Sequence, residues 1–362
     1  MLSAFTRLNR SAYFAIGLFA LIVLPWLAGA AGGNYWVRVL DFALLYVVLA
    51  LGLNVVVGFA GLLDLGYIAF YALGAYSFAL LASPHLTQQF FQIAGLFPAG
   101  LHFSPWIVAI FAIIVTACFG VILGFPTLQL RGDYLAIVTL GFGEIIRIFM
   151  NNLDRPLNLT NGPKGIMGID PLHVFGINFS KALDLGFMHI PGLYLVFYVF
   201  LIWAMVVTFV CLRIQDSRIG RAWVAIREDE IAAKAMGINT RNLKLMAFAI
   251  GASFAGVAGV LFAAFQGFVS PESFTLWESI VVLAMVVLGG IGHIPGVILG
   301  AVLLAIFPEI LRAGAEPLQK VLFGHVVIDV EIIRQLIYGL ALILIMLYRP
   351  GGIWQKQELP AS

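Results

Sequence analysis

Acidic side chains that interrupt apolar sequence are the groups in this chain best suited to chemistry. Asp64 lies between Gly61 and Gly66, and Glu144 precedes Arg147 by three residues within an apolar run. This spacing puts Glu144 and Arg147 on one helical face, where the two charges can neutralise each other. A carboxylate in such surroundings usually faces the interior of a membrane protein and can contact an ion or a zwitterion. Glu144 is therefore either part of a gate or half of a structural ion pair, and we favour the ion pair.

Motifs for catalysis, metal binding and nucleotide binding are absent from the sequence. No two histidines lie three to five residues apart, and no nucleophile elbow or dinucleotide-binding turn occurs. None of the six lysines follows a glycine, which excludes the phosphate loop of an ATPase. Cys118 and Cys211 lie in apolar runs, as small packing residues do. We therefore expect no enzymatic activity, no metal and no cofactor in this chain, and any ATP and Mg²⁺ would bind to separate subunits.

The composition is that of a membrane protein. Of 362 residues, 62% are hydrophobic and 10% are charged, against about 25% charged in a soluble domain. Charged residues are too few to cover a water-soluble surface, which excludes a secreted module, a cytosolic enzyme and a nucleic-acid-binding protein. At about 20 residues per crossing, the apolar runs suffice for about ten spans of a lipid bilayer.

Ten apolar runs are predicted to cross the bilayer as helices, because a backbone in lipid must satisfy its own hydrogen bonds. The predicted fold class is therefore all-α, a polytopic membrane protein. The first run resembles a signal peptide, and we interpret it instead as a retained first span. The ten runs are Ala12–Ala30, Val39–Val57, Gly66–Ala82, Pro105–Pro126, Tyr134–Met150, Leu193–Leu212, Leu245–Phe268, Leu276–Ile291, Ile294–Leu311 and Ile332–Leu347.

The distribution of lysine and arginine predicts the orientation. With the N-terminus in the cytoplasm, twelve of the 20 basic residues lie on the inner side and seven on the outer side. Both termini are then cytoplasmic, and the loop 213–244, with seven basic residues, is cytoplasmic as well. Residues 1–350 are expected to form one transmembrane domain with a periplasmic loop at 151–191, followed by a cytoplasmic tail at 351–362. The periplasmic loop is typical either of a surface that another protein touches or of an ordered connector.

The cytoplasmic loop is predicted to contain a short helix with an apolar patch. Strong helix formers dominate from Glu228 to Met236, acids come early and Lys234 comes late, and this order suits the helix dipole. Such a helix either lies on lipid headgroups or docks in a groove of a soluble partner, with its charges at the rim. We favour docking, with Ala232, Ala233 and Met236 as the patch, Gly237 as the stop, and Arg227, Glu228 and Glu230 as the rim.

This stretch resembles the coupling loop of ABC importer permeases, whose motif reads E-A-A, three residues, then G. Ala232, Ala233 and Gly237 fit the motif, whereas Ile231 occupies the glutamate position and Glu230 falls one residue early. Three further segments resemble LivM-type permeases of branched-chain amino acid importers, and the likeness extends from about Asp41 to Arg349. The segments are Gly61–Tyr76 (GLLDLGYIAFYALGAY), Leu130–Gly141 (LRGDYLAIVTLG) and Asn161–Ile166 (NGPKGI).

The resemblance implies an assembly in the inner membrane of a bacterium. Such a permease pairs with a second, LivH-like permease and with two ATPase subunits that bind ATP and Mg²⁺. A periplasmic binding protein delivers leucine, isoleucine or valine. The missing phosphate loop agrees with this division of labour.

Glycine-rich interruptions mark candidate positions for a translocation pathway, because broken helices expose backbone to a polar substrate. The same glycines are equally typical of tight turns and close helix contacts. For Gly251, Ala255, Gly256 and Gly259 we expect only a packing seam. Pathway candidates are Gly61, Asp64, Gly66, Tyr71, Glu144, Gly289 and Gly290.

Two other functions fit parts of the sequence. An ion-coupled secondary transporter needs carboxylates near the middle of the bilayer, and Glu144 is the one we consider plausible. A permease for urea or another small amide belongs to the same wider family. Glu278 and Glu309 lie near span ends, and we expect water to solvate them.

Overall fold

The computed structural model describes residues 17, 19–30, 32–97, 101–127, 130, 132–174, 177–179, 182–184, 189–323, 325, 329–348 and 351–353. Residues 12–16 of the first predicted span and 354–362 of the predicted tail lie outside this set. Six basic residues used for the predicted orientation also lie outside it, namely Arg7, Arg10, Arg131, Lys181, Arg349 and Lys356.

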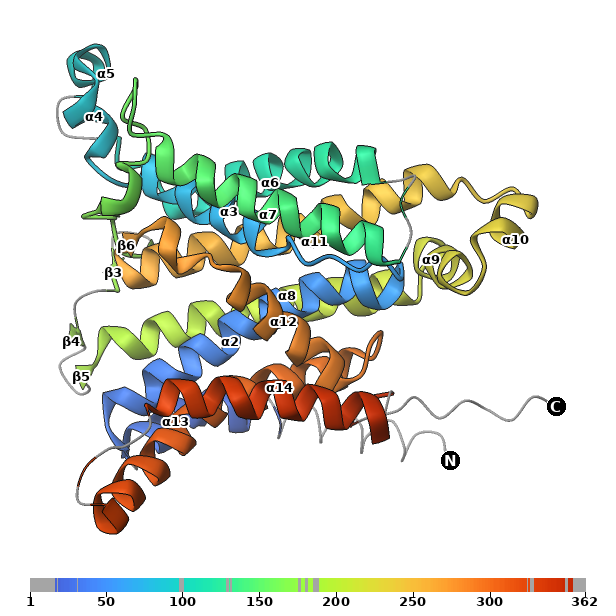
Figure 1. Ribbon diagram of the computed structural model, residues 1–362. Coiled ribbons are helices and arrows are strands. Elements are labelled where there is room, and N and C mark those ends of the chain that lie inside the picture. The colour runs from blue at the N-terminus through green and yellow to red at the C-terminus, as the bar shows by residue number, and fades with distance from the viewer. Residues whose placement is uncertain are drawn as a thin grey trace, which may run out of the picture.

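Long helices form a bundle in which each of the ten predicted spans overlaps one described helix (Figure 1). The first is Phe19–Ala30. The others are α2 (Asn34–Asn54), α3 (Ile68–Leu81), α6 (Pro105–Thr127), α7 (Asp133–Asn152), α8 (Gly192–Gln215), α11 (Thr240–Gln266), α12 (Leu276–Gly289), α13 (Ile294–Phe323) and α14 (Val330–Tyr348). A π-helix, η1 (Val55–Phe59), continues α2.

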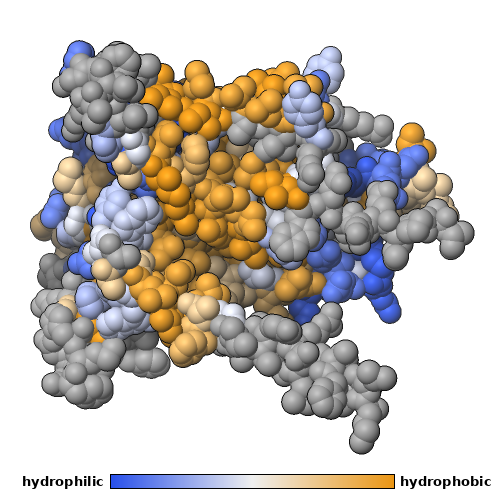
Figure 2. Space-filling view, turned by 90° about the horizontal axis from the view of Figure 1, so that it is seen from below, coloured by the Kyte–Doolittle hydropathy of each residue, from blue (hydrophilic) through white to orange (hydrophobic). Residues whose placement is uncertain are grey.

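Six of the described helices are long and apolar enough to cross a membrane. Figure 2 shows a broad hydrophobic band across the middle of one face, with hydrophilic residues gathered toward both ends. Large apolar side chains such as Ile110 on α6, Ile145 on α7 and Leu336 on α14 are more than half exposed. A lipid environment accounts for this exposure, so the chain is a helical, multi-pass membrane protein.

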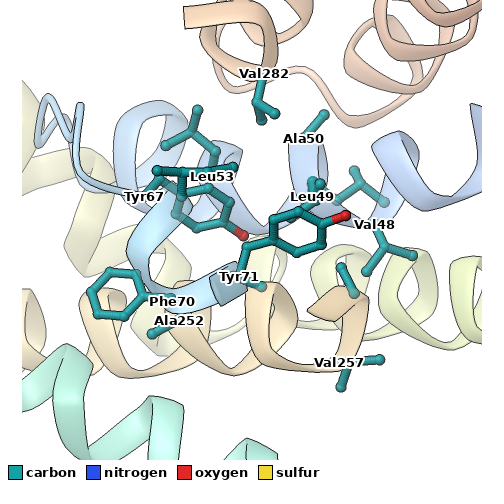
Figure 3. Close-up of a cluster of buried hydrophobic side chains, with 14 of the residues drawn as sticks. Val48, Leu49, Ala50, Leu53, Tyr67, Phe70, Tyr71, Ala252, Val257 and Val282 are labelled. Atoms are coloured by element: carbon teal, nitrogen blue, oxygen red, sulfur yellow. The ribbon is translucent and has the colours of Figure 1, made fainter. Parts of the chain in front are cut away.

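The core lies where α11 packs against α2, α3 and α6. Added side chains at Gly256 and Gly259 would clash with α6 and α3, so these glycines let the backbones approach closely. This result confirms the predicted packing seam. Around it, Leu49 and Leu53 of α2 gather with Tyr71 of α3 in a buried cluster (Figure 3).

Short elements occupy the two ends of the bundle. Three two-stranded antiparallel ladders lie at one end of the bundle, which also carries α4 (His85–Gln89) and α5 (Phe91–Leu96) (Figure 1). They pair β1 (Ile166–Met167) with β6 (Phe268–Val269), β2 (His173–Val174) with β3 (Ile177–Asn178), and β4 (Leu183–Asp184) with β5 (His189–Ile190). The all-α prediction missed these ladders, because two-residue strands carry no detectable alternation. Helices α9 (Arg218–Glu228) and α10 (Glu230–Ala235) lie at the opposite end.

Candidate functional site

The predicted docking helix corresponds to α10, which follows α9 after a corner at Asp229. Helix α9 ends at Glu228, Asp229 is extended, and α10 begins at Glu230. The Asp229 carboxylate accepts the backbone N–H groups of Ile231 and Ala232 at 2.8 and 3.0 Å, which makes it the N-cap of α10. The predicted short helix is therefore present, but it begins at Glu230 instead of Glu228, because the Asp229 cap fixes its start. Gly237, at φ +83°, ends the segment as predicted.

Glu230 fastens α10 to the start of α11. Its carboxylate lies 2.8 Å from the Nζ of Lys244 and 3.1 Å from the Nζ of Lys234, and Lys244 is buried. Burial alone raises the pKa of the Glu230 carboxyl, but the hydrogen bonds and charges of Lys244 and Lys234 lower it below its usual range. Glu230 therefore positions the loop from within, although the sequence placed it at a docking rim.

The outward surface of α10 differs from the predicted patch. Ala233 is 4% exposed and points into the protein, so it does not share a surface with Ala232. Ile231 and Met236 are 68% and 82% exposed. We call Ile231, Ala232 and Met236 the docking face. Ile231, which departs from the resembled motif, supplies much of its apolar area.

Arg227 joins α9 to the end of the second span. Its Nη1 donates to the carbonyl oxygen of Gly58 at 2.6 Å. A Cβ on Gly61 would lie 2.7 Å from the Arg227 Cγ, which is too close. Gly61 also has φ +70°, a conformation that favours glycine, so both the space and the backbone require glycine at this position. Arg227 and Gly61, predicted separately as coupling and pathway residues, thus meet.

Gly58, which follows the second span, and Gly292, between α12 and α13, also lie side by side. The Asn54 side chain accepts the Gly292 N–H at 2.9 Å, across 238 residues of sequence. Around this contact lies an open hollow of about 530 Å³ lined by Gly58, Arg227, Glu228 and Gly292, among others. Asn54 is fully buried, and the sequence analysis overlooked it. A polar side chain inside an apolar span is the signal that would have found it.

Asp64 and Gly66 hold the segment before α3 against α7. Asp64 is 1% exposed, and its Oδ1 accepts the Gly66 N–H at 2.9 Å. Its Oδ2 has no hydrogen-bond partner in the described part of the chain. A side chain on Gly66 would clash with the Thr139 carbonyl, and the Thr139 hydroxyl accepts the Leu65 N–H at 3.0 Å. The contact of Leu65 and Gly66 with Thr139 holds this segment in place. The Oδ2 atom of Asp64 can still accept a hydrogen bond.

The Glu144–Arg147 ion pair is formed, as favoured from the spacing. The Arg147 guanidinium lies 2.9 Å from Glu144 and 3.6 Å from Glu272, which connects α7 to the turn η3 (Pro271–Ser273). Tyr71 is buried, with its ring against Phe262 and Phe274.

Gly289 lies where α12 and α13 cross, and a side chain there would clash with Gly296; Gly290 follows at φ +110°. For these two glycines, close packing and a turn explain the residue type. Neither requires a role in the pathway.

A cavity of about 160 Å³ lies between α2, α12, α13 and α14. Glu278, Glu309 and Arg334 line it, and both glutamates are partly exposed, so their solvation by water stays a prediction. The Tyr46 hydroxyl donates to Glu278 at 3.0 Å. Glu278, Glu309 and Arg334 come from three different helices, so spacing along one helix does not reveal that they share a cavity. Asp41 of α2, also overlooked, is fully buried, and neither carboxylate oxygen has a hydrogen-bond partner among the described residues.

Comparison with known proteins identifies the family. Residues 35–346 match the family model described as branched-chain amino acid transport system, permease component. The high-affinity branched-chain amino acid transport system permease protein LivM of Escherichia coli K12 is 43% identical over 350 residues, covering 93% of this chain and 74% of that protein. The protein BraD of Pseudomonas aeruginosa, with the same description, is 31% identical, covering 87% of this chain and 92% of its own length.

The permease protein LivH of Salmonella typhimurium is 27% identical over 325 residues, so two kinds of permease share this sequence pattern. No solved structure matches the chain. The family model covers most of the chain, and the bundle described above has the membrane-spanning helices that a permease needs. The chain therefore belongs to the family of permease components of branched-chain amino acid transport systems.

Proposed function

We propose that this chain is the transmembrane permease subunit of an ATP-driven importer for leucine, isoleucine and valine in the bacterial inner membrane. It acts with a second, LivH-like permease, two ATPase subunits that bind ATP and Mg²⁺, and a periplasmic binding protein. In this proposal ten helices cross the membrane, residues 1–350 form one domain, and both termini are cytoplasmic. The names of the relatives, which include both LivM and LivH, support the substrate and the pairing.

The arrangement of α9 and α10 is the observation that carries the proposal. The docking face presents the exposed apolar side chains of Ile231 and Met236. The sequence has no phosphate loop, so in this proposal ATP binds to a partner subunit that contacts this face. Such a surface on a short helix suits a groove in a soluble partner. The strands lie at the far end of the bundle, where a binding protein can deliver substrate (Figure 1).

Motion of the partner has two routes into the membrane helices. Displacement of α10 passes through the Glu230–Lys244 contact into α11, and displacement of α9 passes through Arg227 to Gly58 in η1, which continues α2. Both contacts are short hydrogen bonds that involve at least one charged group. A displacement of one partner is therefore expected to move the other partner as well. The permease then rocks as a rigid body between outward and inward openings.

Leucine uptake into proteoliposomes that contain the complete importer tests this proposal. Replacing Met236 with glutamate places a charge in the docking groove, and we expect ATP-dependent uptake to fall at least about tenfold. Met236→Leu keeps the apolar bulk and should transport normally. Because Met236 is 82% exposed, neither substitution disturbs the fold.

Two results would contradict the proposal. Uptake that continues without ATP and stops when the ion gradient is removed would identify an ion-coupled transporter. Uptake of urea or a small amide, with none of any branched-chain amino acid, would identify the other branch of the family.

A further inference from the structure

The cavity between α2, α12, α13 and α14 has the chemistry of a site for a free amino acid. We propose that it binds one zwitterionic amino acid with an apolar side chain during translocation. This inference rests on the proposed function and names a place where the substrate stops. Its lining combines an arginine, two glutamates and two tyrosines with aliphatic side chains.

The charged residues match the two ends of a zwitterion. Arg334 of α14 offers a planar guanidinium that can bind a carboxylate through two hydrogen bonds. Glu278 of α12 offers an acceptor for the ammonium group, and the Tyr46 hydroxyl, 3.0 Å away, holds that carboxylate in place. Glu309 lies 3.6 Å from Arg312 at its exposed side and also accepts from Tyr35. Charged groups inside a membrane protein usually mark a substrate or ion path.

The apolar wall matches a branched side chain. Val281 and Met285 of α12 and Leu304 of α13 line the cavity and are at most 8% exposed. A cavity of about 150 Å³ is known to hold a ring the size of benzene. The volume of about 160 Å³ therefore suits the side chain of one small amino acid and excludes a peptide.

A proline inside α13 leaves one backbone carbonyl beside this cavity without its usual helical donor. Pro308 lies inside the helix and has no N–H, so it cannot donate to the carbonyl of Leu304 four residues earlier. The Tyr338 hydroxyl of α14 donates to that carbonyl instead, at 2.6 Å. Pro308 and Tyr338 both line the cavity, so this contact between α13 and α14 forms part of its wall.

Binding of radiolabelled L-leucine to the purified complex of both permeases and both ATPases, without the binding protein, tests the inference. We expect saturable binding that valine and isoleucine displace. Leucinamide lacks the carboxylate and 4-methylpentanoate lacks the ammonium group, and each should compete at least about tenfold more weakly. These competitors probe the unaltered protein, so misfolding of a variant cannot obscure the result.

Variants then locate the site. Arg334→Gln and Glu278→Gln should each weaken leucine binding at least about tenfold. The matched control Arg312→Gln, whose side chain is 56% exposed, should stay within about twofold. Absence of leucine binding, or affinities unchanged in Arg334→Gln and Glu278→Gln, would overturn the inference while uptake by the complete importer continues. If the complete importer with its binding protein takes up no branched-chain amino acid, that result contradicts the proposed function itself and not only the binding site in the cavity.

Discussion

Two regions of this molecule hold charged residues at the margins of apolar helices, and they use them in opposite ways. In the α9–α10 region, Glu230 lies within 3.1 Å of both Lys234 and Lys244, and no space remains between them. In the α2–α12–α13–α14 cavity, Glu278 and Arg334 line about 160 Å³ of space. The contacts of Glu230 fill the junction between α10 and α11, whereas the cavity holds space for a ligand beside its charged residues. The contrast predicts different outcomes for substitutions in the two regions.

The largest expected effect is on stability in the α9–α10 region. Glu230→Gln leaves the buried ammonium of Lys244 without its carboxylate, which should lower the free energy of unfolding by about 3 kcal/mol. Thermal unfolding of the assembled complex measures this. Lys234→Gln removes only the exposed partner and should change stability by less than about 1 kcal/mol. Equal effects of the two substitutions would contradict the view that Lys244 is the stabilising partner.

The same contact has a predicted pH dependence. The pKa of Glu230 is lowered in the folded protein, so its contribution is fully present above the usual glutamate pKa of about 4.3 and is lost as the pH falls through the lowered value. The stability difference between the parent protein and Glu230→Gln should therefore narrow with acidification. A difference that stays constant down to strongly acidic pH would argue against the ionised pair.

The next effect concerns transmission of motion. Arg227→Ala removes the charged hydrogen bond to Gly58, worth about 2 kcal/mol, and should lower leucine uptake while ATP hydrolysis by the complex continues. Uptake and hydrolysis measured on the same proteoliposomes give the ratio of substrate to ATP. Arg227→Lys retains a donor and should recover part of the coupling. An unchanged ratio of leucine transported to ATP hydrolysed in Arg227→Ala would contradict the role of Arg227. Motion would then pass from the partner to the membrane helices through α10.

In the cavity, removal of one hydroxyl should affect binding without affecting folding. Tyr46→Phe deletes the donor to Glu278 and should weaken leucine binding by about 1 kcal/mol, roughly fivefold, with an unchanged unfolding temperature. A stability loss without a change in binding would mean that this cavity, like the α9–α10 region, uses its charges for structure.

The smallest effect is expected at Glu144. Its ion pair with Arg147 is about a third exposed, so Glu144→Gln should change stability by less than about 1 kcal/mol and leave uptake unchanged. Arg147→Gln should behave in the same way. A severalfold loss of uptake in Glu144→Gln alone would assign that carboxylate to ion or proton movement and would sharpen the case for a coupled transporter.

Features that depend on a few neighbouring residues could be predicted from the sequence. The end of the coupling segment at Gly237 and the ion pair of Glu144 follow from helix geometry over a few residues. Predictions failed where two local preferences compete. Asp229 caps α10, which therefore begins two residues later than predicted, and Ala233 on that helix is buried instead of exposed. The acid that sits one residue early, Glu230, contacts a lysine on another helix.

The amino-acid sequence alone is sufficient to specify helices in a membrane, because these follow from composition and from hydrogen bonding within one segment. The sequence also contains no phosphate-loop motif. The contacts that matter for function join distant residues. Arg227 meets Gly58 across 169 positions, and Tyr46 meets Glu278 across 232. Apolar periodicity tells which face of a helix is buried, but the packing of whole helices selects the partner that each buried polar group meets.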